Sequence, residues 1–157
     1  MSMTGAQLST SAVATAAGLS ESWAWKARDQ GVINEPHFEE DVVALRVYAF
    51  VSQIVWPGTR RPRSARQALE LWQASAVEAA RQAVSDENTT SETALWVLED
   101  SVRLVTTPAE RAAVDLQYLG GRVAFRIPVG LWVTELPEAL ENVRTRRRRS
   151  VGARATS

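Results

Sequence analysis

The chain has 157 residues, of which 45% are hydrophobic, and its 18 basic residues balance 18 acidic ones. This apolar content is sufficient for a buried core and excludes a wholly disordered chain. The chain has no cysteine and a single histidine, His37, which excludes disulfide scaffolds, cysteine nucleophiles and metal sites with several cysteines or histidines.

The charges are distributed unevenly along the chain. Residues 1–66 carry seven basic and six acidic side chains, residues 67–143 carry five and twelve, and residues 144–157 carry six arginines and no acid. We expect the basic end to be a flexible arm that raises non-specific affinity for nucleic acid, although it would equally suit an acidic patch on a second subunit. Its central arginines are Arg144, Arg146, Arg147, Arg148 and Arg149.

The N-terminal segment predicts two short helices joined by a tight turn. A polar pair at residues 9–10 can cap the first helix, and Gly18 ends it. Ser20 is a suitable N-cap for a second helix over about 21–30, and Gly31 stands where a left-handed C-terminal residue is expected. Two helices joined in this way form the smallest unit that presents a helix to the major groove of DNA.

A third helix is expected from Phe38, after a tight connection at residues 34–37. Its apolar positions, up to Ile54, cover more than one face, which indicates a mostly buried helix. A Pro- and Arg-rich connector follows, and then a fourth helix is expected over residues 64–85. This helix can pack within the monomer or across a dimer, because alternating spacings of four and three separate its apolar residues Ala65, Leu69, Trp72, Ala76, Ala79 and Ala83.

The second half of the chain predicts a small α+β unit in the order strand–strand–helix–strand–strand–helix. Residues 94–98 and 102–106 are expected to form a hairpin. Thr107, Pro108 and Glu110 have the pattern of a capping box at the start of the next helix. The remaining elements are an alternating strand, a further strand and a last helix, expected over residues 122–127, 131–135 and 137–144.

One run of residues near the N-terminus has the spacing of a known family of regulators: Gly18-Leu19-Ser20, then Gly31-Val32-Ile33, then Phe38-Glu39-Glu40-Asp41 and Leu45. On these residues, the segment 9–52 resembles the winged helix-turn-helix DNA-binding head of MerR-like regulators. The resemblance implies that the second helix enters the major groove.

The chain departs from this family in three respects. Trp25-Lys26 replaces the usual Arg-Tyr pair of the second helix, and only residues 34–37 stand where the family has its wing, so the wing is reduced. The family's effector-binding cysteines and its long dimerisation helix are also missing, which leaves dimerisation to the helix expected over 64–85.

We therefore predict an α+β fold with an N-terminal helical (winged) helix-turn-helix head, a linking helix and a small C-terminal ββαββα domain. The expected boundaries are a DNA-binding head at 1–56, a linker and an amphipathic helix suited to dimerisation at 57–86, an α+β domain at 94–144 and a basic disordered tail at 145–157.

The side chains expected to face DNA are polar, basic or aromatic. Lys26 and Arg28 can bind phosphates, and Arg28 can also bind guanine. Trp23 and Trp25 must point to different sides of the helix, and Trp23 is peripheral if the alanines of this helix form its packing face; the reverse arrangement is equally open. The expected DNA-binding residues are Ser20, Ser22, Trp25, Lys26, Arg28, Arg60, Arg61 and Arg63.

We predict a sequence-specific transcriptional regulator, such as a phage or mobile-element repressor, that binds double-stranded DNA as a homodimer. The alternative is a protein-interaction or assembly adaptor, which the reduced wing and Glu21 on the presented helix suggest. An enzyme, a cofactor and a metal site are not expected, since His37 is interpreted as a connector residue and Glu39-Glu40-Asp41 as compensation of a helix dipole. Lacking a signal peptide or a membrane-spanning run, the protein is expected in the cytoplasm.

Overall fold

The computed structural model describes residues 6–56, 73–99, 101–116 and 123–155, with the side chains of 150–155 excepted. Within these ranges the chain is an α+β structure with six helices and a three-stranded antiparallel sheet of order β2-β1-β3. The strands are β1 (Ala94–Val97), β2 (Val102–Val105) and β3 (Phe125–Ile127). The helices are α1 (Thr10–Ala16), α2 (Glu21–Asp29), α3 (Glu39–Val51), α5 (Ala74–Ser85), α6 (Pro108–Val114) and α7 (Val129–Ala155).

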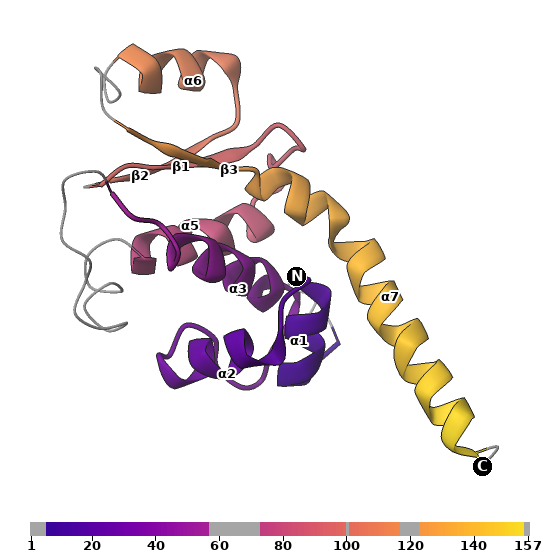
Figure 1. The fold of residues 1–157 in the computed structure, drawn as a ribbon. Helices are drawn as coiled ribbons and strands as arrows, with labels where there is room; N and C mark the ends of the chain where they lie inside the picture. The colour runs from indigo at the N-terminus through magenta and orange to yellow at the C-terminus, as the bar shows by residue number, and fades with distance from the viewer. Residues whose placement is uncertain (1–5, 57–72, 100, 117–122, 156–157) are drawn as a thin grey trace.

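The elements are stacked in layers (Figure 1). Helix α6 lies on one face of the sheet, while α5 and α3 lie on the other, and α1 and α2 follow beyond α3. Helix α7 leaves the edge of the sheet after β3, contacts α5, α3 and α1, and then extends past the rest of the molecule. None of the helices in the described ranges is both long and apolar enough to cross a membrane.

Residues close in the sequence determine where the first three helices begin and end. Ser9 Oγ accepts a hydrogen bond from Ala12 N at 3.1 Å and so caps α1. The chain turns after α1 at Gly18 and after α2 at Gly31, whose φ angles of 71° and 74° lie in the left-handed region that favours glycine. At the start of α3, Asp41 Oδ2 accepts from Phe38 N at 2.8 Å and satisfies one free donor of the helix.

The predicted hairpin and the predicted cap at Thr107 are confirmed, but the capping box is incomplete, because Glu110 bonds the N–H of Thr106 and not that of the N-cap residue. Strands β1 and β2 pair antiparallel, with Leu95 opposite Leu104. Thr107 Oγ1 accepts from Glu110 N at 3.2 Å, and Glu110 Oε2 accepts in turn from Thr106 N at 3.4 Å. Both features depend on residues only a few positions apart, which explains why the sequence is sufficient to predict them.

Two predictions for the C-terminal region are wrong. Residues 131–135 are helical and belong to α7, so β3 is the last strand and the order is ββαβα in the described residues. The backbone of 145–155 continues the same helix and is not a disordered arm. Pro137, expected to start a helix, lies inside α7, where it removes one backbone hydrogen bond.

Most of the buried apolar residues form one contiguous cluster that runs through α1, α2, α3, α5, β1, β3 and α7. Trp56, which follows α3, packs edge-on against Phe125 of β3 with ring centroids 5.2 Å apart. The segments predicted as head and C-terminal domain therefore share a core. Helix α5 buries Ala76, Ala80 and Ala83 within the monomer, mainly against α3, and residues 64–72 of the helix predicted there lie outside the described ranges.

Candidate nucleic-acid interface

Helix α2 is attached to the molecule through its small residues. Ala24 and Ala27 are fully buried, whereas Ser22, Trp25, Lys26 and Arg28 are exposed, as expected for the face that would meet DNA. The alanines therefore form the packing face, and the tryptophan that points to solvent is Trp25, with 47% of its surface exposed.

Trp23, on the flank of α2, is half-buried. Its ring lies edge-on to the ring of the buried Tyr48 of α3, with centroids 6.2 Å apart. The ammonium of Lys26 also lies over the Trp23 ring, 5.2 Å from the ring centroid. Lys26 is thus held against the body of α2 by an aromatic ring, with its charge at the surface.

A second group of side chains runs along the exposed face of α2 and into the loop that follows it. Trp25 Nε1 donates to Glu21 Oε1 at 3.4 Å, one helical turn earlier. The Arg28 guanidinium lies over the Trp25 ring, 5.2 Å from its centroid, and also forms an ion pair of 3.3 Å with Glu35. We call Glu21, Trp25, Arg28 and Glu35 the α2 clamp; two acids flank one aromatic and one basic side chain.

Ser20 and Ser22 stand at the start of α2. Ser20 occupies the N-cap position, as expected, but its hydroxyl shares a hydrogen bond of 2.9 Å with the Ser22 hydroxyl and does not cap the helix. Both hydroxyls are exposed, next to the free backbone N–H groups of the first turn. This end of α2 can donate hydrogen bonds to an anion such as a phosphate.

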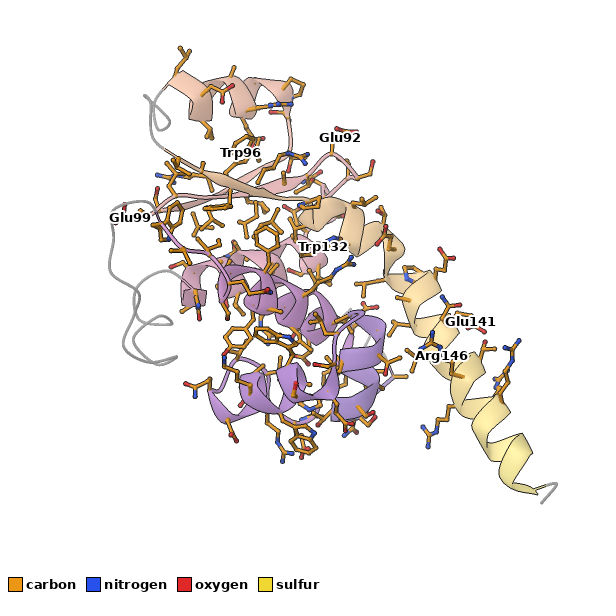
Figure 2. All side chains as sticks on the ribbon, viewed as in Figure 1. Glu92, Trp96, Glu99, Trp132, Glu141 and Arg146 are labelled. Carbon is orange, nitrogen blue, oxygen red and sulfur yellow. The ribbon has the colours of Figure 1, made fainter. Side chains whose placement is uncertain are left out.

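The arginines near the C-terminal end of α7 make this part of the helix basic. Residues Arg144, Arg146, Arg147, Arg148 and Arg149 are exposed, and Figure 2 shows Arg146 on the part of α7 that extends past the other elements. Glu141, one turn earlier, comes within 3.9 Å of Arg144. The connector arginines Arg60, Arg61 and Arg63 lie outside the described residues.

Arg46 of α3 contacts two side chains of α7. Its guanidinium lies 4.3 Å from the centroid of the Trp132 ring in α7, and it forms an ion pair of 3.4 Å with Glu135. Neither Arg46 nor Glu35 is among the residues predicted from the sequence. A basic residue in the otherwise apolar α3 is the available indication for Arg46, whereas Glu35 depends on how the chain turns after Gly31.

The remaining polar clusters have structural partners. His37 is buried, and its Nε2 shares a hydrogen bond of 3.0 Å with the Thr10 hydroxyl, while Leu8 N donates to the His37 carbonyl at 2.8 Å. A groove of about 550 Å³ separates the end of α2 from α5, and Arg81 at its wall pairs with Asp41 at 2.8 Å. Among the described residues, no three histidine, cysteine or carboxylate side chains are grouped so as to hold a metal ion.

We compared the chain with known families, proteins and structures. No protein family, characterised protein or solved structure matches the chain. A function is therefore inferred from the exposed side chains of α2 and from the exposed arginines of α7.

Proposed function

We propose that this chain is a sequence-specific DNA-binding regulator in which α2 enters the major groove. The observation that carries the proposal is the packing of α2, which contacts the molecule through Ala24 and Ala27 and leaves serine, tryptophan, lysine and arginine side chains exposed. These residue types bind phosphates and base edges. The resemblance of residues 9–52 to MerR-like heads supports the same assignment.

The arginine end of α7 supplies the sequence-independent part of binding. Arg144 and Arg146 to Arg149 project from a helix with no acid beyond Glu141, so each can neutralise a phosphate. Phosphate contacts of this kind give affinity that falls steeply with salt, with a log–log slope of about −0.9 per contact. In this proposal α2 provides selectivity and α7 provides affinity.

Selection from random duplex DNA tests the proposal. A homodimer would enrich a palindromic site whose half-sites lie about one helical turn apart. The binding constant for the enriched duplex should fall with added salt and should stay well above the binding constant for a scrambled duplex throughout. A pool that shows no enrichment at micromolar protein and low salt would overturn the proposal.

A protein-interaction adaptor is the second candidate, and the α2 clamp favours it. Glu21 and Glu35 offset much of the positive charge on the exposed face of α2, which suits a protein surface better than a phosphate backbone. This candidate predicts no enriched DNA site, together with a stoichiometric protein partner whose affinity for α2 changes little with salt and is lost on Trp25→Ala.

A further inference from the structure

One acid of the α2 clamp, Glu35 in the loop that follows α2, pairs with an arginine that would otherwise be available to a phosphate. Glu35 Oε1 lies 3.3 Å from Arg28 Nη2, and both side chains are open to solvent, with 58% and 39% of their surfaces exposed. A phosphate that binds Arg28 competes with this carboxylate for the guanidinium and brings the negative DNA backbone close to it. Glu35 therefore opposes binding to DNA in general.

Glu35 opposes the binding of a guanine edge to Arg28 less than it opposes the binding of a phosphate. Its O6 and N7 atoms are neutral acceptors that match the two-pronged guanidinium, so binding to them adds no charge repulsion with Glu35. The penalty from Glu35 is thus larger for phosphates than for guanine. A difference of this kind raises specificity even though it lowers total affinity.

The rest of the α2 clamp fixes the direction of Arg28. Its guanidinium lies over the Trp25 ring at 5.2 Å, and Trp25 is itself oriented by the hydrogen bond from its Nε1 to Glu21 Oε1 at 3.4 Å. An arginine held between a ring and a carboxylate has fewer orientations to lose when it binds.

We propose that Glu35 is a specificity-determining positioning residue. It orients Arg28 so that the guanidinium binds a guanine edge in preference to a phosphate. This inference rests on the proposed DNA-binding function, because it assigns the base that one side chain of the same surface would contact. It predicts a guanine in the selected site whose enrichment depends on both Arg28 and Glu35.

The test compares Glu35→Gln with wild type on the selected duplex and on a scrambled duplex, over a series of salt concentrations. Glu92→Gln is the matched control, because Glu92 is an exposed acid in the loop before β1, at the opposite end of the molecule from α2 (Figure 2). We expect Glu35→Gln to bind the scrambled duplex about two- to five-fold more tightly, the effect of releasing one exposed ion pair. The salt slope should steepen by about 0.9 per subunit, and the preference for the selected duplex should fall.

The control variant should retain the wild-type slope and preference. Arg28→Gln should lose the guanine preference, and adding Glu35→Gln to it should cause no further change in that preference, because the carboxylate affects guanine binding through the arginine. If wild type binds selectively and Glu35→Gln keeps its slope and preference, the role of Glu35 is overturned while the proposed function stands. If wild type binds no duplex, the proposed function fails and the role of Glu35 fails with it.

Discussion

Among single residues, Asp41 makes two structural interactions, one at the start of α3 and one with α5. It is buried, its Oδ2 accepts from Phe38 N at the start of α3, and its Oδ1 pairs with Arg81 of α5 at 2.8 Å. Asp41→Asn removes the negative charge and leaves the arginine, which keeps 21% of its side chain exposed, without the nearer of its two carboxylate partners. We expect a loss of about 2 kcal/mol in the free energy of unfolding, less than for a fully buried pair, measured by urea denaturation.

Glu40 provides the control for this prediction. It pairs with the same arginine at 3.3 Å, but 46% of its side chain is exposed. Glu40→Gln should cost less than about 1 kcal/mol, because solvent screens the pair. Equal losses for the two variants would show that the burial of Asp41 does not strengthen its ion pair.

Because of Tyr48, we expect the free energy of unfolding to fall at alkaline pH. Burial raises the pKa of the Tyr48 phenol above its ordinary value of 10.0, and the nearby Ser52 opposes this only in part. The folded state therefore favours the neutral phenol. The unfolded chain ionises first, so this stabilisation is complete below the unfolded pKa and is lost as the pH rises above it.

Unfolding measured between about pH 8 and pH 11 checks this prediction. Wild type should lose more free energy of unfolding than Tyr48→Phe over that interval, since the variant has no phenol to ionise at this position. Parallel curves for the two proteins would show that Tyr48 does not limit stability at high pH.

The sequence is informative about which residues of α2 face solvent and not about what they contact. Helical periodicity places Lys26 away from the alanines, and the structure agrees, whereas Arg28 follows Ala24 by one helical turn and is exposed at the edge of the packing face. The ion pair of Arg28 with Glu35 depends on the path of the chain between Gly31 and α3, which no periodic pattern specifies.

Among the elements, α7 shows how local preference and packing can disagree. The β-forming run Leu131-Trp132-Val133 and a proline at 137 favour a strand followed by a new helix. The apolar residues Val129, Val133, Leu136, Leu140 and Val143 are instead spaced by four and three, and the first four of them pack against the core as one helical stripe. The free energy of this tertiary contact outweighs the local preference for a strand.

The first turn of α7 is held by a close backbone contact at Gly130. Its N–H donates to the Thr93 carbonyl at 2.8 Å, and a Cβ at this position would collide with the carbonyl oxygens of Thr90 and Thr93. We expect Gly130→Ala to lower the free energy of unfolding by about 3 kcal/mol, because backbone atoms cannot move aside as a flexible side chain can.

Gly18→Ala is the comparison for this prediction. Its φ angle of 71° makes alanine unfavourable, but no atom lies within 4 Å of the new Cβ, so the cost should be about 1 kcal/mol. Denaturant unfolding of both variants measures the difference. A smaller loss for Gly130→Ala than for Gly18→Ala would contradict the close contact.

At the scale of the whole molecule, the proposal that α2 provides selectivity and α7 provides affinity leads to a separate prediction. Replacing the five exposed arginines of α7 by glutamine should weaken binding to the selected and the scrambled duplex alike, and should flatten the salt slope by about 0.9 for each phosphate that is no longer neutralised. The preference for the selected duplex should stay the same. The replaced residues are Arg144, Arg146, Arg147, Arg148 and Arg149.

Thermal unfolding of this variant should match wild type or occur at a slightly higher temperature. The arginines lie beyond the apolar stripe that attaches α7 to the core, and their mutual repulsion at helical spacings disappears. A marked loss of preference for the selected duplex would show that the basic helix contributes to base recognition.

The whole fold is less predictable than its local elements. The charge distribution and the hairpin follow from neighbouring residues, whereas the shared core depends on contacts between distant segments, such as Trp56 with Phe125 and Arg46 with Trp132. Such pairs leave no pattern in a single sequence. They join the segments that local patterns predict to be a separate head and a separate C-terminal domain.

The most direct test of the central claim is a binding titration of the selected duplex with wild type and with the double variant Lys26→Glu, Arg28→Glu. Arg111→Glu is the control, an exposed arginine on α6 beyond the far face of the sheet (Figure 1). We predict that the double variant loses specific binding while its thermal unfolding remains close to that of wild type, and that the control still binds. Unchanged binding by the folded double variant would contradict the assignment of α2 as the DNA-contacting helix.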